Sequence, residues 1–196
     1  MAVLYNINKN NYVSRPKNST IYTPERVSIY LKNILSKQIN PKVILDPAIG
    51  KGALVRPWDN GKRHIIGVDI DNQGKKYCNT FIHKKFEVVQ MWVYRKPDLI
   101  ICNPPFNGAP RRQLYPEVFL RRIVKLFGNR VPIVIVAPIG LRLNVRIKSA
   151  RWQWMNENLE ISSIVSLPID CFGVKFHTEI LIFNINGLKP HYPLYG

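Results

Sequence analysis

The chain has 196 residues, of which 46% are hydrophobic and 21% are charged. These values are typical of one globular domain with a sizeable core, and they exclude a disordered chain or a collagen-like fibre. The unusual feature is the charge, because 29 Lys and Arg residues against 12 Asp and Glu residues give a formal net charge of +17. A field of this sign attracts polyanions, so a nucleic acid or an anionic membrane surface is the expected class of partner.

Several other classes are excluded by local patterns. The longest apolar run, residues 131–141, is too short to span a bilayer and contains two prolines. The N-terminus has no apolar segment of the kind found in signal peptides. The three cysteines lack CxxC spacing, which excludes a disulfide framework or a zinc ribbon. We therefore expect no metal site. The expected location is the cytoplasm, which would be the cytoplasm of the host cell if the gene is viral.

The first predicted element is a helix. Residues 1–20 are polar and rich in Asn and Lys, which predicts an N-terminal arm. A helix is expected to follow Thr23-Pro24-Glu25, because Thr can cap a helix, Pro fits its first position and Glu favours its positive end. Apolar residues then follow at helical spacing from Val27 to Leu35.

After Pro41, short β-branched runs alternate with mixed helical segments. The predicted strands are residues 43–45, 64–68, 86–89, 99–102, 133–137, 161–167 and 179–185. The predicted helices lie around residues 52–56, 72–80, 115–127 and 144–159. This pattern indicates an α/β domain over residues 21–188, followed by a tail over residues 189–196. Its seven-stranded sheet should be mainly parallel, with helices on both faces and an antiparallel last strand.

The first predicted strand ends in a glycine-containing loop, Asp46-Pro47-Ala48-Ile49-Gly50-Lys51-Gly52. Glycines allow a tight turn and a close approach of the backbone to a ligand. An acid at the strand tip suits a cationic amine better than a phosphate. An ordinary turn between a strand and a helix has the same composition, so the loop alone does not decide between the two.

A second acid follows at the end of the next predicted strand. Asp69 lies 23 residues after Asp46, and at this spacing an acid can accept hydrogen bonds from the hydroxyls of a ribose. The alternative is a solvated acid in a turn, and we interpret the neighbouring Asp71 in that way.

The fourth predicted strand ends in Asn103-Pro104-Pro105-Phe106. Consecutive prolines fix φ and lack N–H donors, which leaves their carbonyl oxygens outward in a stiff loop. Asn103 adds an amide oxygen, so two neutral acceptors lie beside an aromatic ring. This combination suits a planar substrate with an amino group. The alternative is a proline-rich turn with a core Phe, which the position at a strand end disfavours.

Taken together and in this order, the motifs resemble the S-adenosylmethionine-dependent N6-adenine DNA methyltransferase family. Tyr22-Thr23-Pro24 resembles the opening of its motif X, the glycine loop resembles motif I, and Asn103–Phe106 resembles its NPPF-type motif IV. The late segment from Leu167 to Phe183 resembles motif VIII, whose aromatic residue helps to hold a flipped base. The resemblance covers about residues 22–186 and implies a Rossmann-like class I methyltransferase fold.

The resemblance also implies a cofactor, S-adenosylmethionine, and a role for individual residues. The implied cofactor-binding residues are Tyr22, Thr23, Asp46, Pro47, Ala48, Gly50, Asp69, Ile70 and Gln90. The implied catalytic residues are Asn103, Pro104, Pro105 and Phe106, with Phe172 on the other face of the base. Gln90 stands where the family usually has an Asp that binds the cofactor's adenine, and Glu87 is the alternative. The amide oxygen of Gln can accept the same hydrogen bond.

The excess positive charge is concentrated after the NPPF motif. Residues 111–151 hold ten basic residues and one acidic residue, Glu117. We expect no separate target-recognition domain, and we predict that Arg111, Arg112, Arg142 and Arg146 contact nucleic acid in its place. The alternative is a solvated helix face.

The leading interpretation is a DNA adenine methyltransferase that acts as a monomer or homodimer, with no membrane partner. An RNA N6-adenine methyltransferase would use the same motif. A protein glutamine methyltransferase would also present an amide to it, although the positive charge disfavours a peptide substrate. An inactive nucleic-acid-binding module is the fourth reading, and the intact acidic and NPPF motifs argue against it.

Overall fold

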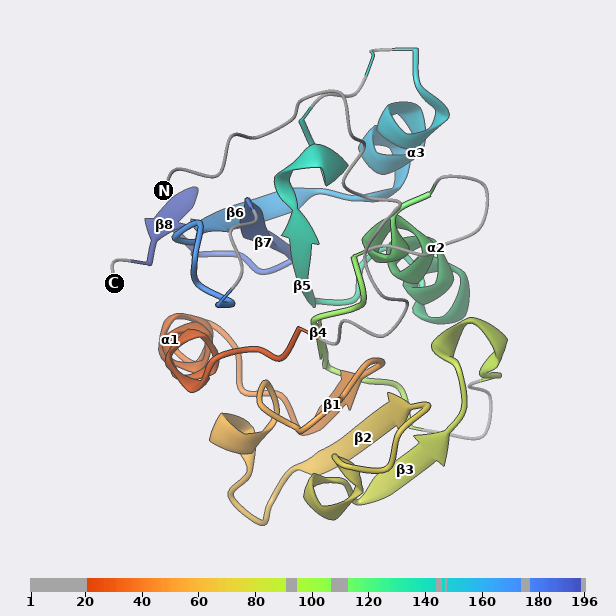
Figure 1. The fold of residues 1–196 in the computed structure, drawn as a ribbon, viewed down its shortest axis with the longest axis vertical. Helices are drawn as coiled ribbons and strands as arrows, with labels where there is room; N and C mark the ends of the chain where they lie inside the picture. The colour runs from red at the N-terminus through yellow and green to blue at the C-terminus, as the bar shows by residue number, and fades with distance from the viewer. Residues whose placement is uncertain are drawn as a thin grey trace, which may run out of the picture.

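The β-branched runs of the sequence assemble into one eight-stranded sheet (Figure 1). The computed structural model describes residues 21–90, 95–106, 113–143, 146, 148–173 and 177–194. The strands are β1 (Val43–Asp46), β2 (His64–Asp69), β3 (Thr80–His83), β4 (Leu99–Cys102), β5 (Ile133–Pro138), β6 (Ile161–Ser166), β7 (Thr178–Phe183) and β8 (His191–Pro193). The helices are α1 (Glu25–Leu35), α2 (Tyr115–Phe127) and α3 (Ala150–Asn158). Short 3-10 turns are η1 (Arg56–Trp58), η2 (Lys75–Tyr77), η3 (Phe86–Val88) and η5 (Ile139–Leu141).

The order of the strands across the sheet is β3-β2-β1-β4-β5-β7-β6-β8. The first five are parallel to one another, β7 runs antiparallel between β5 and β6, and β8 is parallel to β6. Every residue of β1, β4 and β5 is buried, as expected for parallel strands that are covered on both faces. The predicted mainly parallel sheet with an antiparallel late strand is therefore confirmed.

Alternate residues of the central strands pack against helices on opposite faces. Ile44 of β1 belongs to a cluster with Leu31 of α1, whereas the adjacent Leu45 belongs to a cluster with Leu120 of α2. Met155 of α3 packs on the same side as α2. Figure 1 shows α1 apart from α2 and α3 in this arrangement. The prediction of helices on both faces is confirmed.

The third strand was predicted at the wrong place. Residues 86–89 contain the turn η3 instead: Phe86 and Val89 pack into the same hydrophobic cluster, whereas residues three apart on a strand point to opposite faces. The strand is β3, whose Thr80 and His83 pair in register with Ile66 and Asp69 of β2. Its half-buried sequence carries no continuous apolar run to reveal it.

Three predicted helices are shorter than expected. The segment around residues 52–56 forms turns and η1, where Pro57 cannot donate the hydrogen bond that a longer helix needs. The segment 72–80 is reduced to η2, since the chain enters β3 at Thr80. Helix α3 starts only at Ala150, after Ser149 accepts a hydrogen bond from Trp152 N at 3.2 Å.

The count of seven strands was also wrong, because β8 lies inside the predicted tail. Its three residues show no alternation that a sequence pattern would detect, and the strand forms through backbone pairing with Ile164–Ser166 of β6. Tyr30 of α1 also donates a hydrogen bond to Pro193 O at 3.1 Å. The tail is therefore joined to the sheet and to α1. The predicted N-terminal arm, residues 1–20, lies outside the described residues.

No helix among the described residues is long and apolar enough to cross a membrane.

Candidate functional site

The predicted site residues gather at one edge of the sheet because the strands that carry them are parallel. Strand β1 ends at Asp46, β2 ends at Asp69, and Asn103 follows β4 directly. These three strands are neighbours in the sheet, so their carboxyl ends lie side by side. Residues that are far apart in the sequence thereby share one edge.

Asp69 anchors the glycine loop to the second strand. Its Oδ2 accepts a hydrogen bond from Gly50 N at 2.7 Å, and its Oδ1 accepts one from Asp71 N at 3.0 Å. The carboxylate is half-buried, and each oxygen has a further lone pair for another donor. Asp69 is thus more than a solvated turn acid, and it can still accept hydrogen bonds from a ligand hydroxyl.

Two tyrosine rings lie against the glycine loop. Gly50 and Gly52 have positive φ angles, +51° and +75°. A Cβ atom on Gly50 would lie 3.4 Å from the Tyr22 ring, and one on Gly52 would lie 2.4 Å from the Tyr77 ring. The sequence pointed to Tyr22, but it carried no signal for Tyr77, because this contact is made only when η2 packs on the loop.

Asp46 is nearly fully buried, and its charge is unfavourable there. Burial raises the pKa of Asp46 from 3.8 to about 8, the hydrogen bond from Ala48 N–H opposes this increase, and the charge of Asp69 adds to it. Only 1% of the surface of Asp46 is exposed. A cation beside this carboxyl would favour its ionised form, so the group is suited to an ammonium ligand.

The Asn103 side chain has a defined orientation. Its Nδ2 donates to Ile21 O at 3.1 Å and to Thr23 Oγ1 at 3.0 Å. A carbonyl oxygen can only accept, so the amide nitrogen must face Ile21 and the amide oxygen must point away from it. Within the described residues no donor is bonded to Oδ1. The prediction of Thr23 as the helix cap was wrong, because α1 begins at Glu25 and its N-cap is Pro24, whose side chain cannot accept a cap bond.

The two predicted aromatic residues contact each other. Phe106 is 7% exposed, and its ring centroid lies 6.4 Å from that of the half-buried Phe172 at an interplanar angle of 80°. The rings therefore meet edge to face. A planar base fits between two rings only when they are parallel, so one ring has to move before both can stack on it. Pro104 is buried and Pro105 is exposed beside them.

The remaining predicted cofactor residues follow β1, β2 and η3 in the chain. Pro47 is buried, Ala48 is half-buried, and Gln90 is exposed. Ile70 follows β2 with 60% of its surface exposed, and Val88 follows β3 with 63% exposed. Ile70 directly follows the strand that ends in Asp69, so its exposed side chain is available to a ligand bound there.

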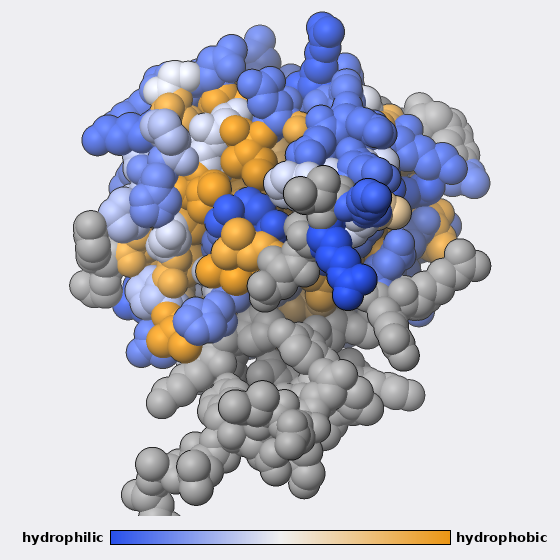
Figure 2. Space-filling model, turned by 90° about the horizontal axis from the view of Figure 1, so that it is seen from above, coloured by the Kyte–Doolittle hydropathy of each residue, from blue (hydrophilic) through white to orange (hydrophobic). Residues whose placement is uncertain are grey.

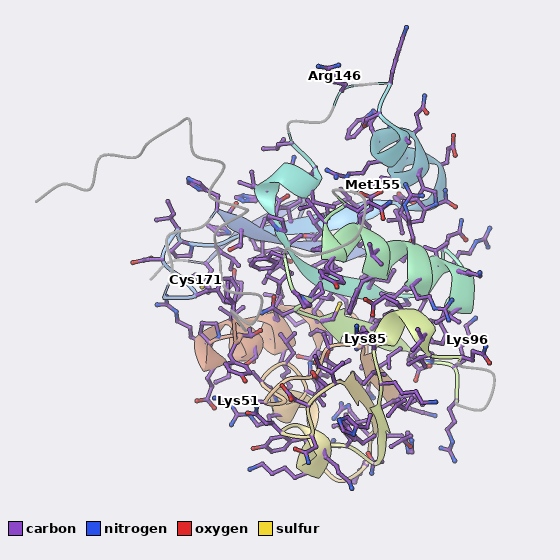
Figure 3. All side chains as sticks on the ribbon, turned by 45° about the vertical axis from the view of Figure 1, so that its right-hand side comes forward. Lys51, Lys85, Lys96, Arg146, Met155 and Cys171 are labelled. Atoms are coloured by element: carbon purple, nitrogen blue, oxygen red, sulfur yellow. The ribbon has the colours of Figure 1, made fainter. Side chains whose placement is uncertain are left out.

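Arg142, one of the predicted nucleic-acid contacts, is paired within the protein. Its Nε and Nη2 donate to the two carboxylate oxygens of Glu179 at 3.1 and 2.9 Å. Its charge is thereby neutralised locally. Arg146 is exposed and projects from the body of the molecule at the top of Figure 3, far from Lys51 of the glycine loop. Arg111 and Arg112 lie outside the described residues.

No family model matches the sequence, and a search of curated proteins found no match. The structure, by contrast, superimposes on solved methyltransferases. The methyltransferase subunit of a type I restriction-modification system from Streptococcus thermophilus gives a TM-score of 0.68 at 15% identity, over 88% of this chain and 46% of that chain. The fold is that of a class I methyltransferase.

Two further structures show the same likeness. A protein from Listeria monocytogenes, described as a class I S-adenosylmethionine-dependent methyltransferase, gives a TM-score of 0.65 at 18% identity over 89% of this chain and 66% of that chain. The M protein of the type I restriction enzyme EcoKI gives 0.64 at 14% identity over 88% and 48%. The chain therefore spans about two thirds of the first protein and under half of the two restriction-modification proteins. The predicted class I methyltransferase fold is confirmed.

The contact of Gly52 with Tyr77 can be tested by substitution. Gly52→Ala should lower the free energy of unfolding by more than Gly61→Ala, because both residues have positive φ but a Cβ atom on Gly61 meets nothing within 4 Å. The backbone strain alone costs about 1 kcal/mol, and the clash with Tyr77 adds about 1 to 3 kcal/mol. Urea unfolding of both variants measures the difference. Equal decreases in the free energy of unfolding would show that the Tyr77 ring moves aside without a cost in stability.

The raised pKa of Asp46 predicts a pH dependence of stability. Between about pH 4 and pH 8 the folded chain holds a proton that the unfolded chain has lost, so the free energy of unfolding falls as pH rises, by at most about 1.4 kcal/mol per pH unit. Asp46→Asn should remove this contribution. Asp59→Asn, which changes an exposed acid, is the control and should retain it. Parallel slopes for Asp46→Asn and the unsubstituted protein would contradict the prediction.

Proposed function

We propose that this chain transfers a methyl group from S-adenosylmethionine to the exocyclic N6 of adenine in DNA. The observation that carries the proposal is the orientation of Asn103, whose amide oxygen is left as an acceptor at the carboxyl edge of a class I methyltransferase fold. The type I restriction-modification proteins that share this fold support the choice of DNA as substrate. The net charge of +17 supports a polyanionic partner.

The residues around the glycine loop fit the proposed cofactor. Asp46 is buried and has no cationic partner among the residues that the structure describes, and the ammonium of the amino-acid part of S-adenosylmethionine would provide one. Asp69 would accept hydrogen bonds from the ribose, and the exposed Ile70 would contact the adenine. When bound, the cofactor supplies an electrophilic methyl group on a sulfonium ion.

The residues of the NPPF motif would prepare the acceptor nitrogen. The lone pair of the adenine amino group is delocalised into the ring, which makes it a poor nucleophile. Asn103 Oδ1 and the Pro104 carbonyl would accept its two N–H groups and direct the lone pair toward the methyl group. The nitrogen would take up the methyl group from the sulfonium, which would leave as a neutral thioether, and would pass a proton to water. Asn103 therefore contributes by position and dipole, without acting as a strong base.

The base has to leave the helix to reach Asn103, and unpaired bases cost less to extrude. Phe106 would stack on it once Phe172 turns from its edge-to-face contact. Phe172 would then cover the other face of the base. The exposed Arg146 would contact the phosphates, together with Arg111 and Arg112.

The role of Asn103 can be separated from its structural contacts. Asn103→Ala should abolish methyl transfer and leave S-adenosylmethionine binding largely intact, because the amide oxygen acts on the base and Asp46 and Asp69 are retained. The lost bonds of Nδ2 to Ile21 and Thr23 should lower stability. Asn184 is a matched control: its Nδ2 also donates to two carbonyl oxygens, those of Asn129 and Val131, outside the site. Asn184→Ala should lower stability but retain transfer. Equal transfer rates for Asn103→Ala and the unsubstituted protein would overturn the proposal.

The product identifies the substrate class. Transfer of a tritiated methyl group should be measured on duplex DNA, single-stranded DNA, RNA and a glutamine-containing peptide, followed by nucleoside analysis. N6-methyldeoxyadenosine is the expected product. N6-methyladenosine from RNA alone would replace DNA by RNA as the substrate, and the absence of cofactor binding in calorimetry would favour an inactive binding module.

Cofactor affinity should depend on pH through Asp46. An ammonium group requires the ionised carboxylate, so binding releases a proton below about pH 8. Between pH 6 and pH 8 the affinity should rise with pH by up to about tenfold per pH unit. Calorimetry in buffers of different ionisation enthalpy counts the released protons. Asp46→Asn should bind weakly and without this dependence, whereas the same pH slope in Asp46→Asn would place the proton on another group.

A further inference from the structure

Two nearly buried glutamates hold three of the basic residues that follow the NPPF motif. The side chain of Glu117 on α2 is 4% exposed, and it accepts from Arg121 at 3.0 Å and from Arg151 at 2.7 Å. The side chain of Glu179 on β7 is 3% exposed and binds Arg142 through two hydrogen bonds. Three of the ten basic residues in 111–151 are therefore held in internal ion pairs.

Two of these ion pairs lead to the turn that follows β5. Arg142 follows η5 directly, and Nη1 of Arg151 donates to Gly140 O at 3.3 Å. The backbone N–H of Ile139 donates to His177 O at 3.1 Å. The turn is thus fixed to β7 by Arg142 and Ile139, and to α2 and α3 through Arg151. Figure 1 shows η5 above the end of β5, with α3 beside it.

The turn after β5 lies next to the candidate active site. Strand β5 is the neighbour of β4, whose carboxyl end carries Asn103, so the turn borders the candidate active site. Beyond it, Leu143 is exposed, and the cations Arg146 and Lys148 are exposed. Figure 2, which views this end of the molecule, shows hydrophilic side chains over much of the surface with hydrophobic ones between them.

Burying two glutamates beneath a basic surface is energetically unfavourable. Each buried carboxylate loses hydration, and each removes one unit of the positive field that attracts a polyanion. Arg121 gains a second contact by lying 4.3 Å over the ring of Trp154, which adds rigidity to the pairing of α2 with α3. Arginine suits this arrangement because its planar guanidinium donates in several fixed directions.

We propose that Glu117 and Glu179 are positioning residues for nucleic-acid binding. They hold the turn 139–142 in the position where it contacts the nucleic-acid backbone on either side of the target base. The proposal rests on the proposed function, since it requires a nucleic-acid substrate. The two glutamates favour binding through the geometry of the arginines, although their own charge disfavours it.

The sign of the charge effect provides the test. Glu117→Gln and Glu179→Gln each raise the net charge by one, so simple electrostatics predicts tighter binding of DNA. Positioning predicts the opposite, a rise of about tenfold in the Kd for a fluorescently labelled adenine-containing duplex. The slope of log Kd against log salt should also become shallower, because fewer phosphates are contacted. Cofactor affinity should not change, which distinguishes positioning from a general loss of structure.

Glu157 offers a matched control. It is an exposed acid on α3, so Glu157→Gln makes the same change of charge without disturbing the turn. This variant should bind DNA as tightly as the unsubstituted protein or more tightly. If Glu117→Gln and Glu179→Gln behave like Glu157→Gln, the positioning role is overturned.

Charge-neutral variants provide a second test if the glutamine variants fold poorly by circular dichroism. Arg151→Lys and Arg142→Lys keep the net charge but lose the multiple hydrogen bonds, and both should weaken DNA binding. Arg130→Lys, at an exposed position outside the network, should not. Unchanged binding in the first two would overturn the inference. If the unsubstituted protein neither binds nor methylates nucleic acid, the proposed function fails instead.

Discussion

The parallel arrangement of β1, β2, β4 and β5 brings the candidate site together. Because these strands run in one direction, the loops that follow them share one edge of the sheet, and Asp46, Asp69 and Asn103 become neighbours. The segment before α1 is joined to this edge through the hydrogen bonds of Asn103 with Ile21 and Thr23. The Asn103 side chain therefore connects residues 21–23 to the end of β4. The same two hydrogen bonds fix the direction of its amide oxygen.

The buried acids divide into two groups with different consequences. Among the described residues, Asp46, Glu117 and Glu179 are the buried ones. The two glutamates have arginine partners within the protein, whereas Asp46 has only a backbone N–H. No basic residue in the part of the chain that the structure describes forms an ion pair with this carboxyl. That contrast supports the view that Asp46 meets its cation in a ligand.

The basic residues in 111–151 fall into a paired group and an exposed group. The concentration of basic residues in 111–151 suggested one continuous surface for phosphates, yet Arg121, Arg142 and Arg151 are paired with buried glutamates. These arginines are held by ion pairs within the protein, whereas cations such as Arg146 are exposed. Counting charges along the sequence could not separate the two groups, because each ion pair except Arg121–Glu117 joins residues from different elements.

The sequence by itself determined the α/β class, the strands β1, β2, β4 and β5, and the motifs at their ends, because continuous apolar runs and their terminal residues are local features. It placed the third strand wrongly and missed β8, since both depend on backbone pairing with a neighbour and not on side-chain pattern. Only the tertiary structure decided that Tyr77 lies against Gly52, that Asn103 faces Ile21 and Thr23, and that Arg142 belongs to Glu179. Such contacts join residues distant in the chain, and their geometry exists only when the sheet and its helices have packed.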